Sequence, residues 1–160
     1  MPDTEKANIK DRPMYSRILV AVDDDEISKL ALDEAIKLAK DQKAKLCIVY
    51  VADEYIPAGE GVPVDFKQHE KSVKKQGQSI LKKMVALARK QHNKVESSLI
   101  EIIEPNHIAA KIIAAADTWH ADLIVLSTHG RKGLNRLLLG SVAEEVMRDA
   151  TVPVHIVKGK

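Results

Sequence analysis

Five short aliphatic segments alternate along the chain with longer segments in which apolar residues recur every three to four positions. Short, continuously aliphatic runs are typical of strands buried on both faces, whereas the three-to-four spacing is typical of amphipathic helices. The predicted strands are 17–23, 45–51, 95–102, 122–127 and 152–157. The predicted helices are 25–40, 68–91, a segment that contains Ile108 to Ala116, and 140–150.

This order of elements predicts an α/β fold, a single doubly wound domain with a five-stranded parallel sheet and helices on both faces. Pro153 has no backbone N–H to donate, so it suits the start of a strand or a sheet edge. Ligands of such sheets bind at the carboxyl ends of the strands, where the strand order reverses. We therefore expect functional residues among Asp23–Asp25, at Asp53 and between Ser127 and Ser141. Within the acidic turn, Asp25 is predicted to be the amino-terminal cap of the helix that follows.

Composition and charge exclude several classes of protein. The net charge is +2, from 25 basic and 23 acidic residues, which is too balanced for a protein dedicated to nucleic acid or to an acidic membrane. The single cysteine, Cys47, excludes an internal disulfide and a multi-cysteine metal site. No apolar run reaches the roughly 18 residues that a membrane-spanning helix needs.

The amino-terminal segment is polar and lacks the apolar core of a secretory signal. We therefore predict a flexible tail over residues 1–14 and one domain over residues 15–160. The lack of targeting features and of disulfides favours a cytoplasmic protein.

The segment that leaves the fourth predicted strand contains Gly130 and then Gly140-Ser141 at the start of a helix. Free N–H groups at a helix amino terminus attract phosphate, and glycine lets an anion approach the backbone. A purely structural alternative stays open, because Ser141 and Glu144 have the spacing of a helix capping box. The phosphate-binding loop pattern that ends in Gly-Lys-Ser/Thr is absent from the sequence.

This segment, together with Asp23 at the end of the first strand, resembles the universal stress protein family over residues 15–158. ATP-binding members of that family carry the pattern Gly-x2-Gly-x9-Gly-Ser/Thr here. Gly130, Gly140 and Ser141 match three of the four positions, and Ser127 replaces the first glycine. The resemblance implies a nucleotide-binding stress-response protein that acts as a sensor or regulator rather than as an enzyme.

The resemblance also implies a role for each matching residue. Asp23 would meet the ribose, and backbone groups at Leu46 would meet adenine. The phosphates would lie on Gly130, Gly140, Ser141 and the backbone of Val142, with Ser127 at the first-glycine position. The implied cofactor is ATP, with or without magnesium, and the implied partner is a second copy of the chain, paired through the last strand.

Two alternative functions stay open at this stage. Ser127 supports an interaction protein of the same family that no longer binds nucleotide. A slow ATPase is the other alternative, although no general base is evident and His129 has no visible nucleophile or orienting acid beside it. Neither nucleic-acid binding nor membrane association is expected.

Overall fold

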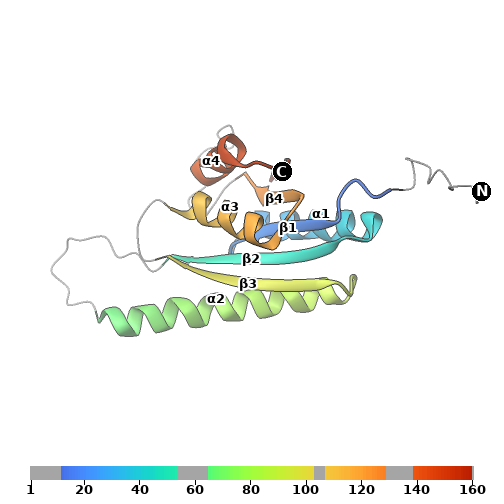
Figure 1. Cartoon of the computed structure of the whole chain (residues 1–160). Coiled ribbons are helices and arrows are strands. Elements are labelled where there is room, and N and C mark those ends of the chain that lie inside the picture. Colours follow the sequence, from blue (N-terminus) through green and yellow to red (C-terminus); the bar gives the residue numbers. More distant parts are fainter. Residues whose placement is uncertain (1–11, 54–64, 103–106, 129–138, 160) are drawn as a thin grey trace, which may run out of the picture.

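The computed structural model describes residues 12–53, 65–102, 107–128 and 139–159. Strands and helices alternate throughout these residues, as Figure 1 shows. The strands are β1 (Arg17–Val22), β2 (Lys45–Asp53), β3 (Val95–Ile102), β4 (Leu123–Ser127) and β5 (Val154–Val157). The helices are α1 (Glu26–Gln42), α2 (Phe66–Arg89), α3 (Ile108–Trp119) and α4 (Ser141–Asp149).

The strands form one parallel sheet in the order β3-β2-β1-β4-β5. The chain therefore moves outward from β1 through β2 to β3, then crosses back to β4 on the other side of β1. This arrangement confirms the predicted doubly wound fold and places the reversal of strand order between β1 and β4. The final strand β5 lies at a sheet edge, directly after Pro153, as Pro153 predicted.

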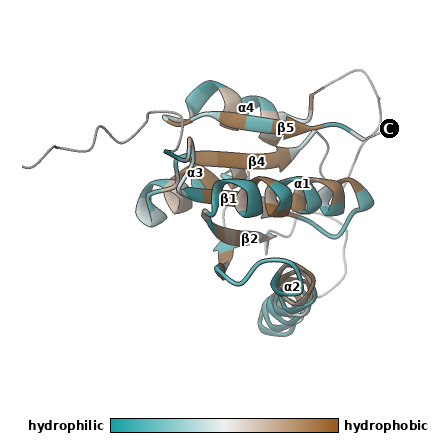
Figure 2. Cartoon of the chain, turned by 90° about the vertical axis from the view of Figure 1, so that its right-hand side faces the viewer, coloured by the Kyte–Doolittle hydropathy of each residue, from teal (hydrophilic) through white to brown (hydrophobic). Residues whose placement is uncertain are grey.

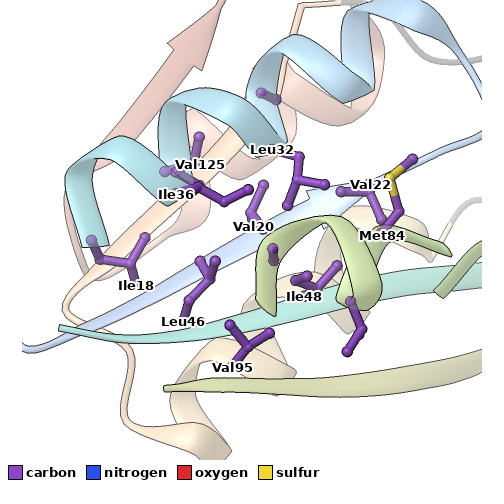
Figure 3. Close-up of a cluster of buried hydrophobic side chains, with 14 of the residues drawn as sticks. Ile18, Val20, Val22, Leu32, Ile36, Leu46, Ile48, Met84, Val95 and Val125 are labelled. Carbon is purple, nitrogen blue, oxygen red and sulfur yellow. The ribbon is translucent and has the colours of Figure 1, made fainter. Parts of the chain in front are cut away.

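Two hydrophobic clusters cover the two faces of the sheet. The first joins α1 and α2 to the face that carries Ile18, Val20 and Ile48, and Figure 3 shows it in close-up. The second joins α3 and α4 to the face that carries Leu19 and Val49. Successive strand residues alternate between the two clusters, which explains why the strands are continuously aliphatic in sequence.

In Figure 2, β4 is coloured as strongly hydrophobic, whereas hydrophilic and hydrophobic residues alternate along α1. In α2 the buried residues follow a three-to-four spacing that includes Ile80, Leu81, Met84 and Ala88. The lysines of this helix occupy other positions, and each is exposed. These lysines thus belong to the solvated face of α2.

Aspartates define the amino ends of both long helices. The side chain of Asp25 accepts a hydrogen bond of 2.6 Å from the Ser28 N–H, which confirms the predicted cap of α1. The side chain of Asp65 accepts a bond of 3.2 Å from the Gln68 N–H, so α2 begins at Phe66, two residues earlier than predicted.

Gly77 allows α2 to approach the sheet closely. A β-carbon at this position would lie 2.7 Å from Cδ1 of Leu99 and 3.0 Å from two ring carbons of Tyr50. Because Tyr50 is almost completely buried, its ring has little room to move away. The absence of a side chain at Gly77 therefore sets the distance between α2 and the β2–β3 pair.

Most of the predicted tail lies outside the described residues, and the domain boundaries remain a prediction. The end of that segment is held against the domain, because the backbone N–H groups of Met14 and of the adjoining Tyr15 both donate to Oε1 of Gln42, at 2.6 and 3.2 Å. Among the described helices, none is long and apolar enough to cross a membrane.

Candidate nucleotide site

The candidate site lies at the carboxyl ends of β1 and β4, where the strand order reverses. Val20 is opposite Val125 in the parallel register, so the residues three positions further on, Asp23 and Thr128, lie level with each other. Ser127 lies one position earlier, at the end of β4. The structure thus brings Asp23 and Ser127 to the same edge of the sheet, as the sequence predicted.

The aspartates of the turn after β1 have different roles. Asp25 caps α1, as described above. The backbone N–H of Asp23 donates to Oγ of Ser28 at 2.5 Å, and Oδ1 of Asp23 accepts from the Asp24 N–H at 2.6 Å. These bonds fix the half-buried Asp23 carboxylate at the sheet edge, where its oxygens could accept hydrogen bonds from a ligand hydroxyl.

The end of β4 is joined to the start of α4 by backbone hydrogen bonds. The Thr128 N–H donates to the Val157 carbonyl at 3.0 Å, and the Thr128 carbonyl accepts from the Gly140 N–H at 2.6 Å. Thr128 itself is buried. The amino terminus of α4 is therefore held beside the switch point.

The capping-box interpretation of Ser141 and Glu144 is wrong. Gly140 occupies the cap position, with φ −62° and ψ 149°, and Ser141 is the first residue of the helix. Gly140 has no side chain, and this end of α4 has no side-chain cap hydrogen bond. The first turn of α4 therefore lacks the acceptor that a capping residue would supply, and its N–H groups suit an anion.

Three of the predicted phosphate-binding residues surround this helix start. Gly140 and Val142 are half-buried, and Ser141 is exposed. Gly130, the fourth, lies outside the described residues, as does His129.

The structure does not bring Leu46 to this site. Leu46 lies near the start of β2 and pairs with Ile18, whereas residue 51 is level with Asp23 in the continued register. Its side chain is fully buried in the first core cluster, and its N–H donates to the Lys94 carbonyl at 2.9 Å. The prediction for Leu46 was therefore wrong, because the start of a parallel strand lies at the opposite edge of the sheet from its neighbour's carboxyl end.

Apolar residues at the correct edge were missed by the sequence analysis. Ala21 and Val51 are half-buried near the carboxyl ends of β1 and β2, and both pack against the cluster beneath α3 and α4. Counting parallel register from the two predicted strand starts would have identified Val51 as the neighbour of Asp23.

Cys47 does not contribute a nucleophile. The thiol is buried in the second core cluster, and burial raises its pKa to about 11. It is therefore protonated at neutral pH and behaves as a small apolar side chain. Across the described ranges, no group of three or more histidine, cysteine, aspartate or glutamate side chains could hold a metal ion.

A doubly wound sheet with an uncapped helix start at its switch point defines a class of α/β proteins that bind ligands at the carboxyl edge. The model of the universal stress protein family matches residues 14–158, nearly the whole chain. The chain therefore belongs to the universal stress protein family, a family of stress-response proteins.

Individual relatives agree with this assignment. The universal stress protein MJ0531 of Methanocaldococcus jannaschii is 34% identical over 147 residues, which cover 91% of this chain and 83% of that protein. A solved structure of a universal stress protein family member from Burkholderia pseudomallei is 32% identical, with a TM-score of 0.74, over 91% of this chain and 98% of that one. A universal stress protein solved in complex with cAMP is 25% identical, with a TM-score of 0.66, over 90% of this chain and 97% of that one.

Proposed function

We propose that this stress-response protein binds ATP at the carboxyl edge of its sheet and acts as a sensor or regulator. The observation that carries the proposal is the start of α4, which has no side-chain cap and is joined through Gly140 to the end of β4. A bound adenine nucleotide in one relative, the cAMP complex, supports the same class of ligand.

Each part of the nucleotide has a matching group at this edge. The N–H groups of Ser141 and Val142 and the hydroxyl of Ser141 would donate to phosphate oxygens. The carboxylate of Asp23 would accept from ribose hydroxyls. Adenine would lie against the apolar side chains of Ala21 and Val51, in place of the role predicted for Leu46.

Two predicted residues keep their roles as part of this proposal. Gly130 would let the phosphates approach the loop backbone, and Ser127 would lie beside the ribose at the first-glycine position. Magnesium would bind together with ATP, coordinated by its phosphates, because the described residues supply no cluster of carboxylates or histidines to hold it.

The proposal assigns no catalytic residue. The carboxylates at this edge include Asp23, whose Oδ1 accepts from the Asp24 N–H, and Asp25, which caps α1. The predicted residue Asp53 also lies here, half-buried, as the last residue of β2. Turnover of ATP in the presence of magnesium would favour the slow ATPase instead. If the protein did not bind ATP, the result would favour the alternative that it is an interaction protein without a nucleotide site. Ser127 is the main support for that alternative.

ATP should stabilise the folded protein against heat. A ligand at one hundred times its dissociation constant adds about 2.7 kcal/mol to the free energy of unfolding. For a chain of this size, that gain corresponds to a rise of roughly 5–10 °C in the melting temperature. Differential scanning fluorimetry with ATP, AMP and cAMP measures the shift. No shift at millimolar ATP, with or without magnesium, would reject the nucleotide proposal.

We also propose that two copies of the chain associate through β5. This strand lies at a sheet edge, and Val154 and Ile156 pack against the core cluster beneath α3 and α4. The carbonyls of Pro153 and Val157 accept bonds from β4, so the backbone groups of Val154 and Ile156 point away from the sheet. An open edge of this kind favours pairing with another strand.

Ile156→Pro should abolish such a dimer, because proline removes an N–H that points away from β4 without breaking the β4–β5 ladder. The matched control is Ile156→Ala, which loses similar side-chain packing but keeps the N–H. Light scattering combined with size exclusion should show a monomer for the proline variant and a dimer for the alanine variant. A dimer of unchanged stability in both would place the interface elsewhere.

A further inference from the structure

A basic groove lies at the edge of the sheet opposite to the proposed nucleotide site. Three segments meet there: the residues before β1, the connection from α1 to β2, and the start of β3. They enclose an open hollow of about 580 Å³. Its charged lining consists of Arg12, Arg17, Lys43, Lys45, Lys94 and one acid, Asp41.

The backbone that carries these cations is fixed by hydrogen bonds. The carboxylate of Asp122 accepts from the N–H groups of Ser16 and Arg17 at 2.7 and 3.0 Å. The Lys45 N–H donates to the Ser16 carbonyl at 2.9 Å. Gln42 holds the preceding residues, as described above. The groove is thus a preorganised part of the domain.

Arg17 is itself held in place. Its guanidinium carbon lies 4.1 Å from the ring centroid of Trp119, and its Nε donates to the Trp119 carbonyl at 2.7 Å. The Trp119 ring is anchored in turn, because Nε1 donates to the Glu96 carboxylate at 2.9 Å. Stacking occupies one face of the guanidinium and leaves its terminal nitrogens available to an anion.

The carboxylate of Asp122 contacts the backbone of Arg17, but no ion pair among the described residues involves a cation of this groove. The ion pairs found among the described residues use other lysines and arginines. Five cations and one acid give the lining a charge of about +4, so the rest of a chain with a net charge of +2 is on balance acidic. The clustered cations repel one another, and a bound anion would reduce this repulsion.

Helix electrostatics explain only part of the cluster. Lys43 is the carboxyl-terminal cap of α1, with φ 54°, where a cation interacts favourably with the helix dipole. Lys45 begins β2 and Lys94 precedes β3, and both side chains are exposed. Lys94 Nζ donates to the Lys43 carbonyl at 3.3 Å, which draws it toward the hollow.

We propose that this groove binds a compact oligophosphate anion. Several phosphate groups in one small ligand match a charge of about +4 better than a single phosphate does. The described lining contains Pro13 as its one apolar residue and no aromatic side chain, so it offers no surface for a base to stack on. The groove is a hollow rather than a long basic track, which favours a compact ligand over an extended nucleic-acid strand.

Inorganic tripolyphosphate is the probe that tests the proposal. In calorimetry at low ionic strength, Lys45→Gln/Lys94→Gln should lower its affinity at least tenfold, and added salt should weaken binding to the wild-type protein. The matched control is Lys82→Gln/Lys83→Gln, two exposed lysines of α2, which should bind as the wild type does. Equal affinity in all three proteins, or an equal loss in both double variants, would overturn the site.

Two further experiments distinguish anion binding in the groove from anion binding elsewhere and from nucleic-acid binding. Gly140→Val should keep tripolyphosphate binding at the groove whether or not it binds ATP, so this test is independent of the nucleotide proposal. A thymidine oligonucleotide should compete weakly. If it binds the groove more tightly than tripolyphosphate and loses that binding in Lys45→Gln/Lys94→Gln, the surface recognises nucleic acid and the proposal is wrong.

Discussion

Gly140→Val should lower the affinity for ATP by well over tenfold, a loss of more than about 1.4 kcal/mol in binding free energy. The proposed phosphates rest on the N–H groups that follow Gly140. A branched side chain at the cap position would occupy the space through which the anion approaches. Calorimetric titration of ATP into the wild type and the variant measures the effect.

The variant is informative because it should fold. The backbone of Gly140, with φ −62° and ψ 149°, is a conformation that any residue adopts, and its N–H bond to Thr128 is unaffected by a side chain. An unchanged melting temperature without ligand is therefore the control. ATP binding equal to the wild type would show that the phosphates do not lie at α4.

Ser127→Gly completes this series, because it restores the first glycine of the motif. Removal of one small side chain should improve ATP affinity by at most about tenfold. If only this variant bound ATP, the natural chain would be a relative that has lost nucleotide binding, and Ser127 would be the cause.

Gly77→Val should destabilise the protein by about 2–3 kcal/mol and lower the melting temperature by roughly 5–10 °C. The new β-carbon would overlap Leu99 and press on the buried ring of Tyr50. The better helix propensity of valine offsets only a few tenths of a kcal/mol. Urea denaturation of the wild type and the variant provides the free energies.

Ser79→Val is the matched control, because it places the same side chain on the exposed face of α2 and should change stability by less than about 0.5 kcal/mol. Combining Gly77→Val with Leu99→Ala should cost less than the sum of the two changes, since the shortened side chain relieves the overlap. Strict additivity would mean that α2 moves away from the sheet instead.

The fold could be predicted from the sequence because its signals are local. Aliphatic runs such as 17–23 predict the positions of the strands. Side chains such as Asp25, whose cap forms as expected, predict where the helices begin. The end of β2 was placed too early, at Val51 rather than Asp53, since the two extra residues are paired to β3 by tertiary structure and not by their own character.

The site was less predictable because it depends on register and on distant contacts. The prediction for Leu46 failed because Leu46 lies at the start of β2, at the opposite edge of the sheet from the carboxyl end of β1. Ser141 fitted a capping pattern, but the cap position is decided by the bond between Gly140 and Thr128, which no local pattern reveals. The basic groove likewise joins residues as far apart as Arg12 and Lys94.

The position of β1 at the centre of the sheet also has a consequence for how the chain folds. Its partner on one side, β2, is connected through a single helix, whereas on the other side Ile18 is opposite Leu123, more than one hundred residues later. During synthesis β1, β2 and β3 emerge first and can form a three-stranded unit with α1 and α2. One edge of β1 then stays unpaired until β4 has left the ribosome, and during this interval that edge is open to pairing with a strand of another chain.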